Sequence, residues 1–321
     1  MLLSRVAETL YWMVRYLVRA EDTARMVMVN SELLLDLPNS ISPGWEPLLA
    51  ITGSAEQFYK HHKEPIERNI VKFLVSDERN PGSILASLDM VRENMRTTRA
   101  IVPQEAWETL RDLRVYAAEN QSSGLSRRGR YDYLRQIISG CQQIMGNLCS
   151  AMSRDRAYSF LYLGWNLERA DIGVRIIDVR AQSLLPKQVE ELKPFSDIQW
   201  KSVLRSLASY QNYRRHVHVR VKGSAVLAFL LQDERSPRSL GYCLAEIDHC
   251  LRELPRNDAP LRTLGRVQRL VKEADVHGLM AENLHEYLEG LQDAMADLHD
   301  HIAATYFQVE PEEREPLAAV G

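Results

Sequence analysis

The sequence predicts an all-α protein, a helical bundle built from two duplicated halves with pseudo-twofold symmetry. Apolar residues recur at helical spacing in almost every segment, and no strand pattern is longer than residues 217–221. Two stretches of sequence also recur about half a chain apart. Hydrophobic residues make up 45% of the 321 residues and charged residues 26%, which is ordinary for a globular protein with a sizeable core.

The strongest sign of duplication is a shared twelve-residue stretch. Residues 73–84 match residues 229–240 at seven of twelve positions, and both contain Asp-Glu-Arg, then Asn or Ser, then Pro-x-Ser. A second echo relates Leu-Val-Arg-Ala-Glu at 17–21 to Leu-Glu-Arg-Ala-Asp at 167–171, in the same order along the chain. Repeats that keep their order and nearly their spacing indicate two related structural units.

This pattern sets the expected domain organisation. We expect a first helical repeat over residues 1–150 and a second over residues 151–308, packed together as one compact unit. The acidic end, residues 309–321, is typical of a flexible tail.

In the first half, the apolar stripe from Leu3 to Met28 predicts a long leading helix that ends before Pro38. In the repeated loops, Asn80 and Ser236 are interpreted as N-caps, with Pro81 and Pro237 at the first helical position. The further helices expected in this half span residues 45–52, 65–75, 81–101, 103–119 and 131–150.

The second half is predicted to open at Ser153, which caps a helix that runs to Leu185. Residues 186–194 are expected to be a connector because prolines lie at both ends. The remaining helices are expected at residues 197–213, 224–232, 239–254, 261–274 and 278–307.

The charged residues of the two leading helices are the candidate binding residues, because three- and four-residue steps bring them onto shared faces. They are Arg15, Arg19, Glu21 and Arg25 in the first helix, and Glu168, Arg169, Asp171 and Arg175 in the second. The repeated loops add Asp77, Arg79, Asp233 and Arg235. A buried charge network that fixes the register of the halves and an anion or substrate site are both consistent with this pattern.

The residues that carry a family resemblance are the start Met1–Glu8, the run Leu10–Glu21, the segment Leu167–Asp171 and the two repeated loops. Together they resemble the alpha-E family, a bacterial all-helical domain named for its Glu-Arg motif, over nearly the whole chain. The first copy has Val18 where that family usually shows Glu, so Glu168-Arg169 is the intact copy. The resemblance implies gene neighbourhoods with circularly permuted ATP-grasp proteins and transglutaminase-like peptidases.

That resemblance also suggests a part in making or modifying a peptide or amide. We expect a non-catalytic partner or scaffold of an ATP-grasp-type ligase, with an Arg- and Glu-rich surface between the repeats that positions a partner or an acidic peptide. The alternative is an enzyme or half-site with Glu168 as the acid or base. In that case Arg15, Arg19, Arg169 and Arg175 would hold a carboxylate or phosphate.

A di-metal helical bundle is the weakest alternative. Glu246 and His249, and likewise Glu282 and His285, have the Glu-x-x-His spacing of di-iron bundles. Both pairs are expected on the wetter side of their helices, and the carboxylates required from two further helices are not evident. We therefore predict no metal and no cofactor.

Bulk properties limit the partners and the compartment. The net charge of −3 disfavours nucleic acid, and no run of about 18 apolar residues predicts a membrane span. The four cysteines are expected to be free thiols, and the first residues do not resemble a signal peptide, so a cytoplasmic location is expected. The basic cluster at residues 127–130 is interpreted as a solvated patch.

Overall fold

The computed structural model describes residues 4–38, 42–184, 195–217 and 220–308. Within these ranges it contains sixteen helices and no strand, so the predicted all-α class is confirmed. The first eight helices are α1 (Ser4–Asp36), α2 (Pro47–Ile51), α3 (Ala55–Tyr59), α4 (Glu67–Val75), α5 (Ile84–Thr97), α6 (Gln104–Glu119), α7 (Gln121–Leu125) and α8 (Arg130–Ala151). The others are α9 (Arg156–Leu184), α10 (Ser196–Ser206), α11 (Tyr210–Val217), α12 (Gly223–Gln232), α13 (Leu240–Arg252), α14 (Asp258–Lys272), α15 (Val276–Ala281) and α16 (Leu284–Tyr306).

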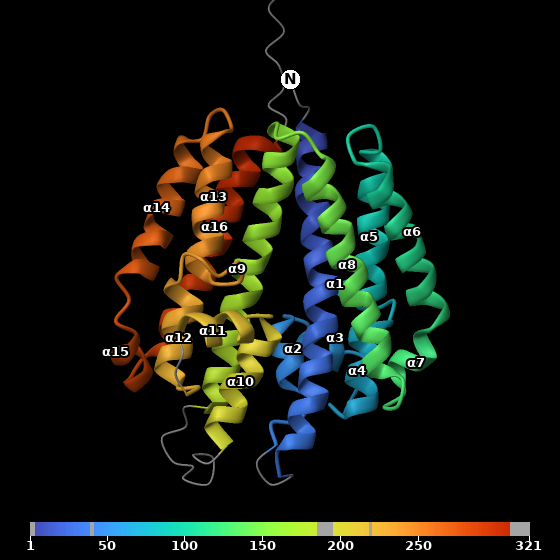
Figure 1. Cartoon of the computed structure of the whole chain (residues 1–321), viewed down its shortest axis with the longest axis vertical. Coiled ribbons are helices and arrows are strands. Elements are labelled where there is room, and N and C mark those ends of the chain that lie inside the picture. The colour runs from blue at the N-terminus through green and yellow to red at the C-terminus, as the bar shows by residue number, and fades with distance from the viewer. Residues whose placement is uncertain (1–3, 39–41, 185–194, 218–219, 309–321) are drawn as a thin grey trace, which may run out of the picture.

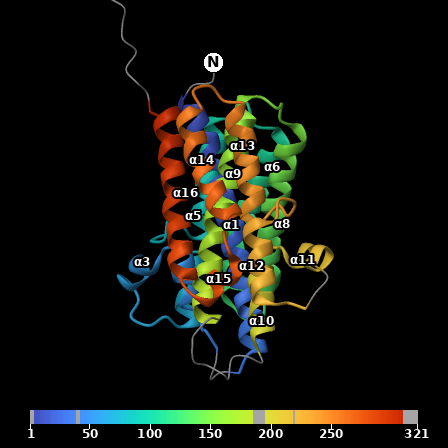
Figure 2. The ribbon, with the colours of Figure 1, turned by 90° about the vertical axis from the view of Figure 1, so that its left-hand side faces the viewer.

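The two longest helices, α1 and α9, lie side by side at the centre of the molecule (Figure 1). Helices α5 and α8 pack on α1 and are flanked by α6, whereas α13 and α16 pack on α9 and are flanked by α14. The view turned by 90° shows these long helices aligned with the long axis of the molecule (Figure 2). Two contacts cross the centre, because α2 packs on α9 and α10 packs on α1.

A single hydrophobic cluster runs through the structure from Ala7 to Tyr306. It takes residues from both expected repeats, including the fully buried Tyr11, Tyr133 and Trp200. Burying apolar surface is the main stabilising contribution to folding. Because one core serves both segments, neither is an isolated hydrophobic unit in this structure.

The predicted N-caps of the repeated loops are wrong by three residues. Helices α5 and α13 begin after Ser83 and Ser239, whose hydroxyls accept the backbone N–H groups of Ala86 and Tyr242, each at 3.3 Å. Asn80 instead forms a turn, because its side-chain oxygen accepts the Gly82 N–H at 2.9 Å. The proline therefore lies in a turn that precedes the helix.

Two other expected helices are interrupted. The predicted helix over 197–213 divides into α10 and α11 around Ala208, whose φ is +51°. The predicted helix over 278–307 divides into α15 and α16 just before Asn283, whose φ is +67°. A positive φ is incompatible with a continuous right-handed helix, so each of these residues ends one helix and allows the next to change direction.

The short helices α3 and α7 were not expected from the sequence. The predicted cap of α9 is wrong by two residues, because Asp155 and not Ser153 accepts the backbone N–H groups of Ala157 and Tyr158. The connector 186–194 and the tail 309–321 lie outside the described residues. Among the described helices, none is long and apolar enough to cross a membrane.

Gly164 sets the separation of α1 and α9. A Cβ atom placed on Gly164 would lie 2.4 Å from the backbone oxygen of Tyr11. Real Cβ atoms do not approach a backbone oxygen so closely, so α1 and α9 can be this close only with glycine here.

We expect Gly164→Ala to lower the free energy of unfolding by at least ~2 kcal/mol, because the added methyl group must push the central helices apart. Urea unfolding followed by circular dichroism measures the change. Gly146→Ala in α8 is the matched control, because nothing lies within 4 Å of its added Cβ and alanine favours helix, for a gain of ~0.5–1 kcal/mol. Equal stability of Gly164→Ala and wild type would contradict the close approach.

Candidate functional site

The candidate site is centred on the interface of α1 and α9. Glu168 of α9 is only 3% exposed, and each of its carboxylate oxygens faces an arginine of α1. The Nε atom of Arg15 donates to Oε2 and the Nε atom of Arg19 donates to Oε1, both at 2.5 Å. The carboxylate of Glu168 is thus fully engaged by two cations from the other central helix.

Arg15 is held in turn by aromatic residues. Its Nη1 donates to the hydroxyl of Tyr11 at 3.0 Å and lies 3.2 Å from Nδ1 of His299 in α16. Its guanidinium stacks over the Trp12 ring at 4.6 Å from the centroid. Tyr11 also lies 2.8 Å from Nδ1 of His299. These contacts hold the Arg15 guanidinium in place next to the Glu168 carboxylate.

The charge state of Glu168 follows from this geometry. Burial opposes ionisation of the carboxyl group, but the nearby charges and hydrogen bonds of Arg15 and Arg19 outweigh it, so the pKa of Glu168 is lowered. Glu168 is therefore ionised at neutral pH. An ionised carboxylate with both oxygens bound is poorly suited to act as a general acid.

Arg169, the next residue, has a different environment. Its guanidinium stacks on Trp165 at 4.2 Å, and its Nε is buried without a hydrogen-bond partner among the described residues. Burial and the positive charge of Arg238 lower the pKa of Arg169 to about 10. Val18 is the residue that matches Glu168 in the sequence repeat, so the first copy has no carboxylate at this position.

A second group of ion pairs lies further along α1. The buried residue Arg238, from the repeated loop before α13, donates to Asp22 at 2.6 Å and to Glu21 at 2.8 Å. Glu21 also pairs with Arg25 and accepts the side-chain amide of Gln142 of α8 at 3.1 Å. The pKa of Glu21 is lowered, since Arg238 and Arg25 overcome the effect of burial.

Asp171 and Arg175 form a partly buried ion pair on α9, with Nε of Arg175 3.2 Å from both oxygens of Asp171. Burial, followed by the repulsion of Glu168, raises the pKa of Asp171 despite Arg175. We refer to the whole set as the Glu-Arg cluster: Arg15, Arg19, Glu21, Asp22, Arg25, Glu168, Arg169, Asp171, Arg175 and Arg238.

A cavity of about 520 Å³ opens beside this cluster, and we call it the interhelix cavity. Its wall comes from α1, α9, the α2–α3 turn and the repeated loop before α5. The charged residues that line it are Arg19, Asp22, Glu168, Asp171 and Arg175. Gly53 has a φ of +64°. A Cβ atom placed on Gly53 would lie 3.2 Å from Nη1 of Arg175, so the turn packs closely against this guanidinium.

The predicted site residues of the repeated loops do not join the cluster. Arg79 donates to Asp77 at 2.6 and 2.9 Å, and these hydrogen bonds lower the pKa of Asp77 to about 2. Asp233 accepts the backbone N–H groups of Arg235 and Ser236, while the side chain of Arg235 is exposed. In both loops the aspartate stabilises the turn, so these four residues have a local structural role.

Four residues of the site were not among the predicted binding residues, namely Tyr11, Asp22, Arg238 and His299. Tyr11 and His299 gave no sequence signal, because their contact joins α1 to α16 across most of the chain. Arg238 did give a signal. It is one of the five positions at which the twelve-residue copies differ, and the first copy has Gly82 there.

Two of the four cysteines, Cys243 and Cys250, lie buried in α13. Burial raises the pKa of Cys243 to about 11 and that of Cys250 to about 12, so both are protonated thiols at neutral pH. Among the described residues, no group of three or more histidine, cysteine, aspartate or glutamate side chains is placed to hold a metal ion. His249 and His285 of the two Glu-x-x-His pairs are exposed.

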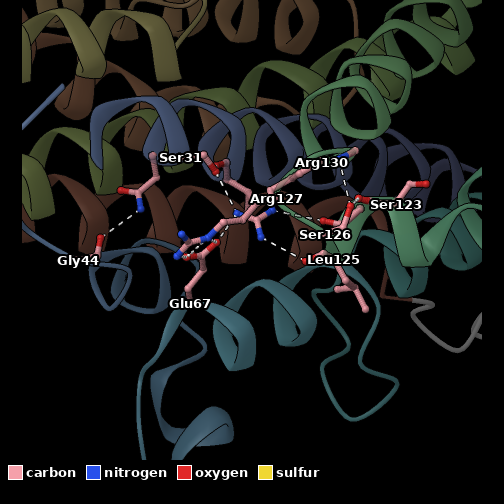
Figure 3. A network of polar contacts seen from close by, with 12 residues as sticks. Ser31, Gly44, Glu67, Ser123, Leu125, Ser126, Arg127 and Arg130 are labelled. Atoms are coloured by element: carbon pink, nitrogen blue, oxygen red, sulfur yellow. Dashed lines mark hydrogen bonds and ion pairs between the residues drawn. The ribbon is translucent and has the colours of Figure 1, made fainter. Parts of the chain in front are cut away.

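Another cavity, of about 570 Å³, lies between α1, α4 and α8, and Trp45 forms part of its wall. Glu67 accepts hydrogen bonds there from Arg127 and Arg130, as Figure 3 shows. Arg130 is buried and stacks on Trp45 at 5.4 Å, whereas the side chain of Arg127 is 84% exposed. The predicted solvated patch is therefore wrong for Arg130, because Glu67 from a distant segment neutralises it.

The fold and the cluster define an all-helical protein with a buried glutamate clamped by two arginines across its central helix pair. Residues 2–307 match the model of the Alpha-E family, described as a predicted alpha-helical domain with a conserved ER motif, and the chain belongs to that family.

Curated relatives are more distant and longer. The chain is 22% identical over 331 aligned residues to Uncharacterized protein Mb2597 of Mycobacterium bovis and to Uncharacterized protein Rv2567 of Mycobacterium tuberculosis. Each alignment covers 94% of this chain but only 36% of the relative, so the chain spans about a third of their length. No solved structure matches the chain significantly.

Proposed function

We propose that this protein is a non-catalytic partner of an ATP-grasp-type peptide or amide ligase, and that the interhelix cavity holds a carboxylate of the partner or of an acidic peptide. A transglutaminase-like peptidase is the second partner that we propose. The observation that carries the non-catalytic role is the state of Glu168, which is ionised and has both oxygens bound by arginine. A residue held in this way stabilises structure and is not free to transfer protons.

The charge of the cluster supports an acidic ligand. The cluster has six arginines and four carboxylates, and the members that line the cavity are Arg19, Arg175, Asp22, Glu168 and Asp171, so a carboxylate would bind at the two arginines. Arg19 and Arg175 line the cavity, with side chains that are 34% and 36% exposed. Partly exposed guanidinium groups bind carboxylates through paired N–H donors.

The family motif lies at the same place. Among the Glu-Arg dipeptides in the described part of the chain, the glutamate is buried only in Glu168-Arg169. We therefore assign the motif of the family description to these two residues. Of these two residues, Glu168 lines the interhelix cavity.

We further propose that the protein arose by duplication, with pseudo-twofold symmetry relating α1 to α9. Several local features recur in the two halves. Ser83 and Ser239 cap corresponding helices, and Trp45 and Trp200 each precede a turn with a residue of positive φ, Gly53 or Ala208. The crossed packing of α2 on α9 and α10 on α1 also fits this relation.

The alternative proposal is an enzyme half-site that a partner completes. It is favoured by one observation, because Asp171 lines the cavity and has a raised pKa, which is a property of general acids. In that case Asp171→Asn would abolish turnover by the assembled complex while leaving the complex intact. In the non-catalytic proposal the assembled complex would keep its turnover.

Capture of the partner tests the first proposal. The tagged protein, expressed together with its genomic neighbours, is expected to retain an ATP-grasp ligase identified by mass spectrometry. Arg175→Gln is expected to reduce that retention at least tenfold, because it removes a cation from the cavity wall. Arg92→Gln, an exposed change on α5, is the matched control and should retain the ligase fully. Absence of any ATP-grasp protein with wild type would contradict the proposal.

A further inference from the structure

The two repeated loops differ at the position that faces the central helices. The first has Pro81-Gly82-Ser83 and the second has Pro237-Arg238-Ser239. Arg238 is 8% exposed, and its guanidinium donates to both Glu21 and Asp22 of α1. Gly82 has no side chain, and it lines the interhelix cavity.

Only one of the two acidic residues opposite the second loop has an acidic counterpart, since Asp22 matches Ile172 in the sequence repeat. In the sequence repeat, Glu21 of α1 matches Asp171 of α9, and each has an arginine four residues later. Glu21 accepts from Arg25, Arg238 and Gln142. Among the described residues, Asp171 has a hydrogen bond only from Arg175. Asp171 therefore lacks the counterpart of Arg238.

The first loop lacks a side chain at position 82, although its backbone conformation does not require glycine there. Gly82 has no positive φ, and a Cβ there would meet only the side-chain oxygen of Asn80, at 3.3 Å. The backbone of this loop therefore accepts larger residues with a small adjustment of Asn80. The space beyond Gly82 is part of a cavity of about 520 Å³, which is large enough for a side chain of a bound peptide.

The balance of charge at this end of the cavity agrees with an unfilled cation position. Asp22, Glu168 and Asp171 all line it, and the pKa of Asp171 is raised by burial and by Glu168 even with Arg175 beside it. A cation that approached Asp171 would relieve this repulsion. The carboxylate-binding arginines, Arg19 and Arg175, line the same cavity, so one ligand can contact both kinds of charge.

We propose that the interhelix cavity has a cation subsite at Asp171, where a ligand's guanidinium or ammonium group occupies the space that the Arg238 side chain fills in the second loop. This inference rests on the proposed function, in that the cavity is a ligand site. It refines the ligand from an acidic peptide to one that also carries a basic side chain or a free amino group. The Arg238 guanidinium, which pairs with Glu21 next to the second loop, therefore corresponds to the cationic group that a ligand would place on Asp171 next to the first loop.

The direct test uses Nα-acetyl-L-argininamide (called argininamide below), whose guanidinium is its only charge, and Nα-acetyl-L-citrullinamide (called citrullinamide below), its neutral analogue. Calorimetry is expected to show binding of argininamide to wild type and at least tenfold weaker binding of citrullinamide. Asp171→Asn should weaken argininamide binding at least tenfold. Equal binding of the two amides, or no binding of argininamide, would overturn the subsite.

A second variant fills the subsite from within the chain. Gly82→Arg, alone or with Asn80→Ser to reproduce the second loop, is expected to place its guanidinium on Asp171 and to reduce argininamide binding at least tenfold. Its thermal midpoint should equal or exceed that of wild type. Gly82→Ala is the matched control and should keep binding. Unchanged argininamide binding by a folded Gly82→Arg protein would overturn the subsite, and the Asp171→Asn comparison decides the matter if that variant fails to fold.

The partner-capture experiment separates this inference from the proposed function. If argininamide fails to bind while Arg175→Gln still releases the ligase, only the cation subsite is wrong. If argininamide binds as expected while wild type captures no ATP-grasp protein, the subsite stands and the partnership is wrong.

Discussion

Glu168→Gln is expected to lower the free energy of unfolding by ~3–5 kcal/mol at pH 7, because it removes the negative charge that Arg15 and Arg19 share. Arg15 is buried and has no other carboxylate within ion-pair distance in the described structure. A buried arginine without a counter-charge is strongly destabilising, whereas the amide of glutamine offers at most one acceptor. Urea unfolding measured by fluorescence and circular dichroism gives the change.

The pH dependence of this loss follows from the lowered pKa of Glu168. A carboxyl group with a lowered folded-state pKa adds stability above its ordinary value of 4.5 and loses that contribution as the pH falls through the lowered value. The gap between wild type and Glu168→Gln should therefore be constant from pH 7 down to about 5 and narrow only below pH 4.5. A gap that already closes near pH 6 would contradict ion pairing by an ionised Glu168.

Two changes serve as controls for Glu168→Gln. Glu56→Gln alters an exposed ion pair with Lys60 on α3 and should leave the unfolding midpoint unchanged. Arg169→Gln changes the other half of the motif and should cost far less than Glu168→Gln. Within the described residues Arg169 has no counter-ion in hydrogen-bond contact, and its removal relieves the repulsion of Arg238. Equal losses at the two positions would mean that the motif acts as one mutual ion pair, contrary to the observed contacts.

The fold class was predictable because long helices with an apolar stripe leave a regular pattern in the sequence. Helices α1 and α9 fall close to their predicted ranges for this reason. The interruption at Ala208 was not predictable, since alanine rarely adopts a positive φ, whereas Asn283 is of a residue type that is enriched in this region. The caps were misplaced because Asn80 and Ser83 are both good capping residues, and the deciding interaction is local turn geometry.

The sequence grouped most charged residues of α1 and α9, but it gave neither their pairing nor the contributions of Tyr11, Asp22, Arg238 and His299. The charged residues of α1 and α9 were identified by helical spacing, which links residues of one helix such as Asp171 and Arg175. Spacing within a helix cannot say which residue of another helix lies opposite, so the clamp of Arg15 and Arg19 on Glu168 had to come from the structure. Arg238 could have been found from the sequence, because it is an arginine at one of the positions where the two copies of the repeat differ.

Arg238→Met is expected to lower the free energy of unfolding by ~3–5 kcal/mol at pH 7, comparable to the effect at Glu168. Arg238 is the ion-pair partner of Asp22, which is only 1% exposed, and it shares Glu21 with Arg25. Methionine fills much of the same volume, so the loss reports charge and not a cavity. Arg235→Met, in the same loop but exposed, is the matched control and should leave stability unchanged.

The deficit at Arg238, like that at Glu168, is larger at high pH than at low pH, but it arises from a raised and not a lowered carboxyl pKa. Burial already raises the pKa of Asp22, and removal of Arg238 raises it further. A carboxyl group with a raised folded-state pKa destabilises the fold as the pH rises above its ordinary value, so the deficit of Arg238→Met should grow from pH 4 towards pH 7. A deficit that stays constant over this range would show that Arg238 contributes by packing alone. In that case the ion pair would not be the model for a ligand's cation at Asp171, and the assignment of the subsite would rest on the binding experiments only.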